Sequence, residues 1–330
     1  MKKDFFRQWE FILFIILIAV NIINASLSPY YLSVNGILDA TTVFMEKGFL
    51  ILPMAFVMIL GDIDISVAST MTLSSVIASV SYKAGLPMGY AIIVALIVGT
   101  LCGFLNGYLI SRWHLTAMIV TLATMSLYRG IAYIILGDQA VSSFPQWFSY
   151  LAQGYLGSTH IPFSLIVFAV FAIIFGLILH KTAFGRYVYA IGNNAEASRF
   201  SGVDVNNIKL AVFTITGLMS AIAGLFLTSR IGSSRPDIAT GYELEAIAIV
   251  VLGGVSPQGG IGKMLGVIIS FFIIGLLRYG MGLKNVPSQM MIIFIGILLI
   301  VAIVIPNIIE SSGARRRLNT EIKGDKSNAV

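Results

Sequence analysis

The chain has 330 residues, of which 57% are hydrophobic and 11% charged, and its mean hydropathy is +0.92. Soluble domains carry about a quarter charged residues, so this composition excludes an ordinary soluble protein. The net charge of +6 would favour a nucleic-acid partner in a soluble chain. In a membrane protein, basic residues instead concentrate in the cytoplasmic loops. No nucleic-acid partner is therefore expected. With Cys102 as its single cysteine, the chain cannot form an internal disulfide or a thiolate metal cluster.

Repeated apolar stretches predict an all-α polytopic membrane protein, because a helix satisfies its own backbone hydrogen bonds in lipid. We expect about ten transmembrane helices, at residues 10–28, 43–60, 65–82, 88–111, 116–137, 161–180, 209–230, 241–254, 264–282 and 288–306. The stretch 241–254 is too short for a full crossing, so a short or re-entrant helix is expected there. Residues 1–309 then form a single transmembrane domain, and residues 310–330 form a polar cytoplasmic tail.

The basic residues orient these helices. Alternate loops carry Arg112, the cluster Lys181, Arg186, Arg199 and Lys209, then Lys263, and finally the arginines of the tail. The long loop 138–160 contains no Lys or Arg, and its Trp147, Phe148, Tyr150 and Tyr155 suit a membrane interface. The positive-inside rule therefore places both termini and the loop 181–209 in the cytoplasm.

A weak internal repeat divides the chain into two halves. An apolar helix ends in "LGDIDIS" at residues 60–66, and another ends in "VLGGVSPQGGIG" at residues 251–262. A glycine-containing apolar helix follows each of them. Both junctions face the cytoplasm in the predicted topology, which indicates a parallel repeat of the kind found in transporters. Chance similarity between glycine-rich apolar segments is the alternative.

Asp62 and Asp64 stand where a membrane helix should end. One hypothesis is an ion-coupled secondary transporter, in which these carboxylates carry protons or sodium at a broken helix. The other is that one of them caps the next helix by accepting its free backbone N–H groups. A coupling carboxylate should lie near the middle of the bilayer, whereas these two lie at the cytoplasmic end of a predicted span. The position favours the cap, and we expect Asp64 to hold this junction near the gate.

The inner loop 181–209 predicts a short helix at about residues 194–201. Asn193 can serve as its N-cap, Glu196 as the capping-box partner and Gly202 as the C′ residue. Such a helix would expose Phe200 beside Arg199, which suits docking into a cleft of a cytoplasmic partner. The alternative is that the loop folds back on its own bundle.

Signatures of catalysis are missing from the sequence. No HExxH motif occurs, and the Gly262-Lys263 pair has Pro257 where a phosphate-binding loop needs its first Gly and Met264 where it needs Ser or Thr. We therefore expect a transport subunit rather than an enzyme, with no catalytic residue, no cofactor and no metal on this chain. If ATP drives transport, another subunit must hydrolyse it.

Several motifs resemble those of permease subunits of ribose-type ATP-binding-cassette (ABC) importers, in the family order from about residue 40 to 306. They are "GDIDISVAS", "TLATMSLYRG", "FGRYVYAIGNNAEASRFSGV", "GYELEAIAIVVLGGVSPQGGIG" and "GLLRYGMGL". Asp62 and Ala68 stand where the family usually has Gly. Permeases for rhamnose or autoinducer-2 also look similar, so the resemblance does not select the solute.

The resemblance implies a subunit that imports a sugar or sugar-like solute across the bacterial inner membrane by alternating access. It implies three protein partners: an ABC ATPase with two fused cassettes, an extracytoplasmic sugar-binding protein and a second permease copy. The residues implied in coupling to the ATPase are Asn193, Asn194, Glu196, Arg199, Phe200 and Gly202. Those expected to face the binding protein are Arg230, Arg235, Asp237, Glu243 and Glu245.

The translocation path or gate is predicted from polar residues within apolar stretches: Asp64, Asn106, Thr121, Thr124 and Arg129. Arg129 lies inside a predicted span, so its guanidinium should line the path or bridge helices, with snorkelling towards the interface as the alternative. Arg278 lies nearer a helix end, where snorkelling is expected.

Overall fold

The computed structural model describes residues 9–27, 31, 33–157, 159–287, 289–291, 293–294 and 296–297. The chain divides into two compact units, Met1–Asn285 and Val286–Val330. In the second unit residues 289–291 are helical, and the Met291 N–H donates to the Pro287 carbonyl at 3.2 Å. The predicted tail 310–330 and most of the predicted span 288–306 lie outside the described residues.

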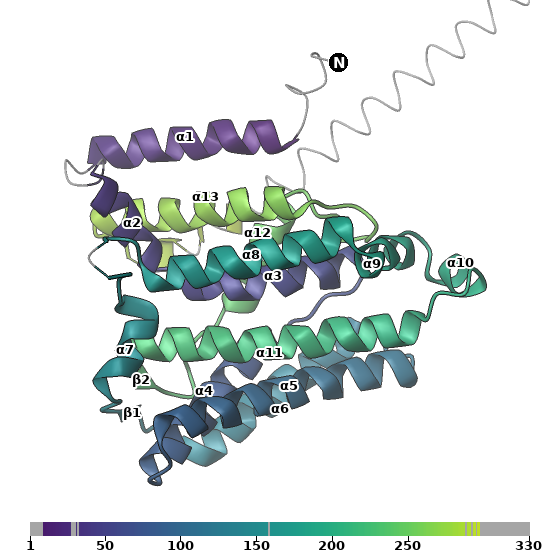
Figure 1. Cartoon of the computed structure of the whole chain (residues 1–330), viewed down its shortest axis with the longest axis horizontal. Helices are drawn as coiled ribbons and strands as arrows, with labels where there is room; N and C mark the ends of the chain where they lie inside the picture. The colour runs from purple at the N-terminus through teal and green to yellow at the C-terminus, as the bar shows by residue number, and fades with distance from the viewer. Residues whose placement is uncertain are drawn as a thin grey trace, which may run out of the picture. The chain divides into compact units, whose positions relative to one another are not determined.

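The first unit is built almost entirely of helices (Figure 1). They are α1 (Trp9–Leu27), α2 (Val34–Thr42), α3 (Met45–Ile59), α4 (Val67–Lys83), α5 (Met88–Arg112), α6 (Ala117–Leu136), α7 (Gln146–Gln153), α8 (Phe163–Lys181), α9 (Ala183–Asn193), α10 (Ala195–Phe200), α11 (Val205–Ile231), α12 (Tyr242–Leu252) and α13 (Met264–Leu283). Two short strands, β1 (Val141–Ser142) and β2 (Ser233–Ser234), pair antiparallel, with Val141 opposite Ser234.

Six helices in the described part of the chain are long and apolar enough to cross a membrane: α1, α5, α6, α8, α11 and α13. A seventh crossing can be formed by α2 and α3, which are bent by 65° at the break between them. The helix α4 has 17 residues and α12 has 11, so neither passes the same length test. The polytopic helical class and the short helix near residues 241–254 agree with the sequence prediction, whereas the count of ten spans is not confirmed.

The centre of the first unit is α3, in which every residue from Met45 to Ile59 is buried. The long helix α11 packs closely on α5 through glycines. A Cβ atom on Gly103 would lie 2.3 Å from the Phe213 carbonyl oxygen, and one on Gly217 would lie 2.2 Å from the Gly99 carbonyl oxygen. Small residues are needed here because the two backbones meet directly, as in other membrane helix pairs.

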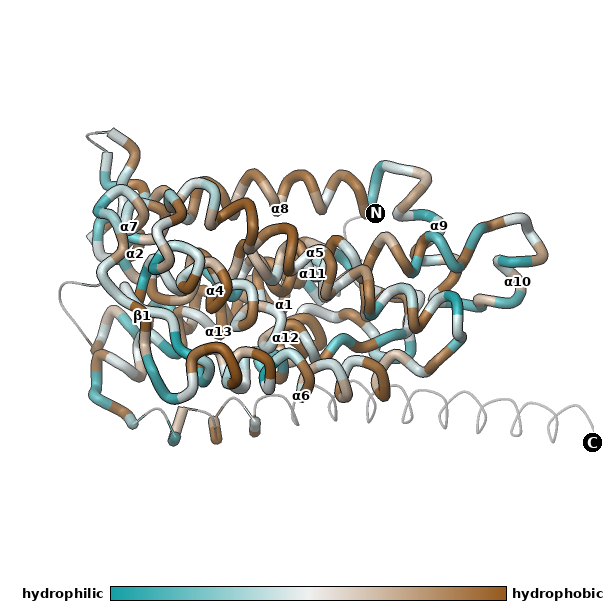
Figure 2. Tube along the Cα trace, turned by 90° about the horizontal axis from the view of Figure 1, so that it is seen from below, coloured by the Kyte–Doolittle hydropathy of each residue, from teal (hydrophilic) through white to brown (hydrophobic). Residues whose placement is uncertain are grey.

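Outer helices present apolar side chains to their surroundings. Ile134 of α6 is 86% exposed, and α1, α5 and α8 carry further exposed Ile and Leu residues. The hydropathy colouring shows α8 as a hydrophobic helix along one side of the bundle (Figure 2). This surface suits a lipid environment, in which exposed apolar side chains carry no cost.

The helices end at two opposite faces of the unit (Figure 1). We call them the α10 end, which carries α9, α10 and the turns 60–66 and 253–263, and the α7 end, which carries α7, β1, β2 and the start of α12. The two turns of the weak repeat meet at the α10 end, where the Gly260 N–H donates to the Ile59 carbonyl at 2.8 Å. Both junctions therefore face the same end, as the predicted topology requires.

Candidate functional site

The short helix α10 projects from the α10 end, and its cap differs from the prediction. Asn194, not Asn193, is the N-cap, and its Oδ1 accepts the Ala197 N–H at 2.9 Å. Asn193 instead ends α9, where its amide donates to the Tyr189 carbonyl at 2.9 Å. Because the cap moves by one residue, Glu196 stands at N2, and the predicted capping box is wrong. Gly202 has φ of +83°, as the predicted C′ position requires.

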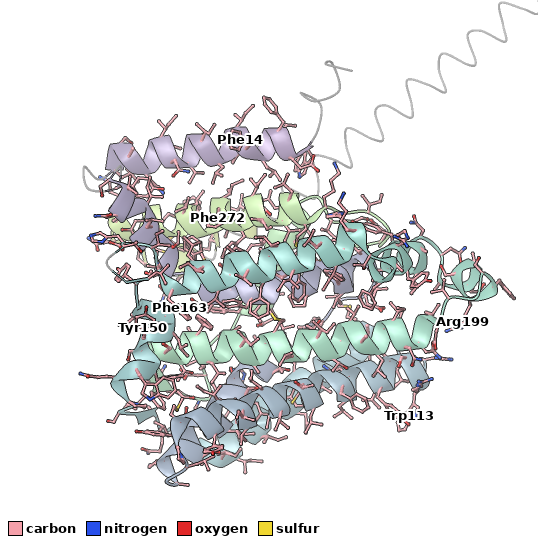
Figure 3. All side chains as sticks on the ribbon, in the orientation of Figure 1. Phe14, Trp113, Tyr150, Phe163, Arg199 and Phe272 are labelled. Carbon is pink, nitrogen blue, oxygen red and sulfur yellow. The ribbon has the colours of Figure 1, made fainter. Side chains whose placement is uncertain are left out.

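The outer face of α10 is not packed against any part of the chain that the structure describes. Phe200 is 93% exposed, which is unusual for so large an apolar side chain outside a lipid-facing helix. Arg199 is also exposed and donates to the Asn206 side chain at 3.2 Å. It lies at the far tip of the unit in Figure 3. The side chain of Phe200 is therefore not folded back onto its own bundle.

Helix α9, which precedes α10, packs against the two junction turns. A Cβ on Gly192 would lie 1.8 Å from the Ile59 carbonyl oxygen and 2.5 Å from the Gly260 nitrogen, so only glycine fits. The Tyr189 hydroxyl donates to the Gly262 carbonyl at 2.6 Å. Burial raises the pKa of Tyr189 to about 12, so this hydroxyl keeps its proton at neutral pH. A displacement of α9 would therefore move both turns.

A buried hydrogen-bond network starts at Asp64. Its Oδ1 accepts the backbone N–H of Ser66 at 2.8 Å and the Ser66 hydroxyl at 2.6 Å. Ser66 is the N-cap residue of α4, so Asp64 orients the cap and is not itself the cap. The Ser66 Oγ accepts from the Asn106 amide at 2.8 Å, and the Asn106 Oδ1 accepts from the Tyr128 hydroxyl at 3.2 Å. The network thus joins α4, α5 and α6, and burial raises the pKa of Asp64 to about 6.

Four of the five predicted path residues come together here. The Thr121 hydroxyl donates to the Ile63 carbonyl at 3.2 Å, next to Asp64, and Thr124 lies one turn further along α6. Asp64, Asn106, Thr121 and Thr124 are each at most 5% exposed. In this conformation they form a sealed polar core between α4, α5 and α6.

The fifth residue, Arg129, lies apart from this core. One guanidinium nitrogen donates to the Thr72 hydroxyl at 2.9 Å and to the carbonyls of Pro236 and Ile238 at 2.6 and 2.8 Å. The side chain therefore bridges α6, α4 and the segment between β2 and α12. This is the interhelical role that was expected, and the snorkelling alternative is not observed.

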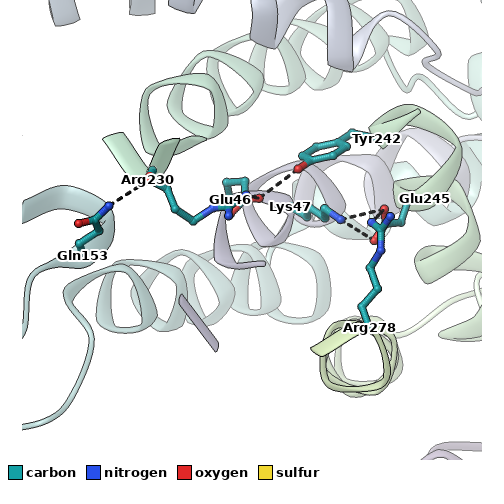
Figure 4. Close-up of polar contacts among 7 residues, drawn as sticks. All are labelled: Glu46, Lys47, Gln153, Arg230, Tyr242, Glu245 and Arg278. Carbon is teal, nitrogen blue, oxygen red and sulfur yellow. Dashed lines mark hydrogen bonds and ion pairs between the residues drawn. The ribbon is translucent and has the colours of Figure 1, made fainter. Parts of the chain in front are cut away.

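A second group of charges is buried near the α7 end, where α3, α11, α12 and α13 meet (Figure 4). Lys47 Nζ lies 2.8 Å from Glu245 Oε1, and Arg278 pairs with the other oxygen of the same carboxylate. Arg230 lies 2.8 Å from Glu46 Oε1, which also accepts from the Tyr242 hydroxyl at 3.3 Å. We call these six residues the ion cluster.

The ion cluster corrects three predictions. Glu245 is buried rather than exposed towards a docking partner, and Arg230 is turned inward onto Glu46. Arg278 does not snorkel, because it neutralises Glu245. These pairs join residues up to 198 positions apart, so no sequence spacing revealed them. The only local signal was the adjacent Glu46 and Lys47 within an apolar stretch.

The remaining residues of the predicted docking set stay nearer the surface. Arg235 and Asp237 form an exposed ion pair at 2.7 Å, with about half of each side chain accessible. Glu243 is half-buried at the start of α12, and its Oε2 has no hydrogen-bond partner among the described residues.

Comparisons with known proteins add to this geometry. Residues 36–303 match the family described as the permease component of branched-chain amino acid transport systems. The ribose import permease protein RbsC of Bacillus subtilis is 38% identical over 295 residues, which cover 89% of this chain and 90% of that protein. RbsC of Haemophilus influenzae is 36% identical over 91% of this chain and 93% of its own length.

A relative with a different solute in its name is almost as similar. The autoinducer 2 import system permease protein LsrD of Escherichia coli K12 is 34% identical over 302 residues, which cover 90% of this chain and 91% of that protein. No solved structure matches the chain.

Proposed function

Because the chain belongs to this family of membrane permease components, we propose that it is the membrane subunit of an ATP-driven importer that moves a sugar or sugar-like solute by alternating access. Relatives named for ribose and for autoinducer 2 are 34–38% identical to it, which supports that solute class without choosing one member. ATP would be hydrolysed on a separate subunit, since this chain has no phosphate-binding loop.

The observation that carries the proposal is the exposed apolar side chain of Phe200 on α10, next to the tightly packed helix α9. Phe200 is 93% exposed, while the neighbouring helix α9 contacts both junction turns at Gly192. An apolar side chain held out from a charged surface suits insertion into a cleft of a partner. We assign that partner as the ATPase, with Asn194, Glu196, Arg199 and Gly202 shaping α10 and Asn193 ending α9.

Orientation and the other partners follow from the same proposal. The α10 end faces the cytoplasm, together with both termini, and the membrane is the bacterial inner membrane. The α7 end then faces outward and receives the sugar-binding protein. There the exposed Arg235–Asp237 pair and the half-buried Glu243 are the members of the predicted docking set that remain available to it. A second permease copy completes the path, and the ATPase has two fused cassettes.

Secondary transport coupled to ions at Asp62 or Asp64 has less support. Both carboxylates lie in the turn at the α10 end rather than midway along a helix. Asp62 is paired with Lys209, and Asp64 is hydrogen-bonded to Ser66. In this conformation Asp62 is compensated by Lys209, and Asp64 is shut off from solvent, with only 2% of the residue exposed.

Reconstitution tests the proposal. The permease, its ATPase and its binding protein are placed in proteoliposomes, and uptake of ribose is measured with and without ATP and with an uncoupler. We expect uptake that requires ATP and survives the uncoupler. Phe200→Ala should abolish uptake, whereas Phe14→Ala, on the exposed side of α1, should leave it unchanged. Uptake that needs a proton gradient and no ATP would contradict the proposal.

A further inference from the structure

Asp62 forms an ion pair that ties the turn after α3 to the start of α11. Lys209 Nζ lies 2.6 Å from Asp62 Oδ2, and the two side chains are 20% and 13% exposed. Asp62 is also fixed through its backbone, because its N–H donates to the Val57 carbonyl at 3.1 Å. Asp62 is therefore held by α3 through its backbone and by α11 through its side chain.

The start of α11 is in turn joined to α10. Arg199 of α10 donates to the Asn206 side chain at 3.2 Å, and only residues 201–204 separate the two helices. Asp204 caps α11 by accepting the Asn207 N–H at 3.0 Å. The first turns of α11 therefore have to follow a rigid movement of α10.

On the other side, the turn leads into the buried core. Asp62 lies two residues before Asp64, which orients the N-cap Ser66 of α4 and through it reaches Asn106 of α5. A shift of the turn that carries Asp62 would therefore change the start of α4. The contacts run without a gap from α10, through Lys209 and Asp62, to the core between α4 and α5.

We propose that the Asp62–Lys209 pair is a positioning link that transmits movement of α10 to the α3–α4 turn. The link rests on the proposed function, in which an ATPase moves α10. Partly buried ion pairs add little to stability but can fix one arrangement of two elements against another.

Hydrogen exchange of the purified permease in detergent tests whether the Asp62–Lys209 pair holds the turn 61–66 and the start of α11 together. Lys209→Met and Asp62→Asn should each speed exchange of the amides in both 61–66 and 205–209 about fivefold. The double variant should be no faster than either single variant, because the two changes remove one interaction. Lys263→Met is the control: it removes the Lys263–Glu10 pair at the same end, which does not involve α11. Equal exchange in Lys209→Met and Lys263→Met would overturn the link.

Transport measurements test whether the Asp62–Lys209 pair couples ATP hydrolysis to solute uptake. In the reconstituted importer, each single variant should lower ribose uptake per ATP hydrolysed about fivefold, while ATP hydrolysis itself persists. The charge-reversed pair, Asp62→Lys with Lys209→Asp, should restore much of that ratio, a rescue that loss of folding would not show. An unchanged ratio in both single variants would overturn the coupling role. Wild-type uptake that does not depend on ATP would instead contradict the proposed function. In that case the hydrogen-exchange experiment would still test the mechanical role of the Asp62–Lys209 pair.

Discussion

Lys47 Nζ of α3 lies 2.8 Å from Oε1 of Glu245 on α12, and both side chains are more than nine-tenths buried. The same carboxylate also binds Arg278 of α13, so one acid pairs with two bases. The ammonium of Lys47 lies 4.4 Å from the centre of the Tyr242 ring, which adds a cation–π contact. The helix α12 is too short to cross a membrane alone, and this cluster holds its first turn on α3 and α13.

Removing the shared carboxylate should strongly destabilise the protein. We expect Glu245→Gln to lower the free energy of unfolding by about 3 kcal/mol, because Lys47 and Arg278 are left as uncompensated charges in a poorly hydrated site. The measurement is unfolding of the purified protein in detergent, followed by its circular dichroism.

The matched control is Asp237→Asn, which breaks the exposed Arg235–Asp237 pair at the same end of the molecule. Exposed pairs contribute less than about 1 kcal/mol, so this variant should unfold almost as the wild type does. If Glu245→Gln were as stable as Asp237→Asn, the ion cluster would not hold α12.

Replacing Gly192 by alanine tests the contact between α9 and the two junction turns. We expect Gly192→Ala to lower the free energy of unfolding by about 2 kcal/mol or more, because its Cβ would lie 1.8 Å from the Ile59 carbonyl oxygen and a backbone has to move. Gly130→Ala is the control. Nothing lies within 4 Å of a Cβ at Gly130, so alanine should stabilise α6 by a few tenths to about 1 kcal/mol. Thermal unfolding in detergent compares the two, and equal stability would refute the tight contact.

The helical membrane class could be predicted because apolar runs are a local property of sequence. The short helix α10 was found for the same reason, since a cap residue and a following Gly lie close together in the chain. The cap was wrong by one residue because α9 continues through Asn193, and helix ends depend on packing that local signals do not contain. The predicted span 43–60 coincides with α3, whereas the preceding helix α2 and the bend of 65° between α2 and α3 were not predicted.

The candidate site was predicted less completely. The polar residues Asp64, Asn106 and Thr121 were recognised individually because each is unusual in an apolar stretch. The hydrogen bonds between α4, α5 and α6 could not be predicted, because partners such as Ser66 and Asn106 lie 40 positions apart and meet only when the helices pack. The same limit explains Arg278 and Glu245: a charge near a helix end looks solvent-exposed until its partner is known.

Asp64 and Asp62 should respond differently to truncation. Asp64→Ala removes both hydrogen bonds to Ser66 and with them the orientation of the α4 cap, which should cost about 2 kcal/mol. Asp62→Ala breaks one partly exposed ion pair and should cost about 1 kcal/mol or less. Thermal unfolding of the two variants in detergent decides the ranking, and equal stability would show that the Asp64 network contributes no more than the Asp62–Lys209 pair.

Asp64 also predicts a pH dependence. Burial raises its pKa in the folded protein from the ordinary value of 3.8 to about 6, so the folded state binds this proton more tightly than the unfolded state does. Stability from this group is then fully present below about pH 4 and is lost as the pH rises through 6. Asparagine is neutral at every pH and keeps an oxygen that can accept from Ser66. The melting temperature of Asp64→Asn minus that of the wild type should therefore increase between pH 5 and pH 7. All other titrating groups are shared by the two proteins, so their effects cancel in this difference of melting temperatures. A difference that stays constant between pH 5 and pH 7 would show that the Asp64 carboxylate is not held in an unfavourable site.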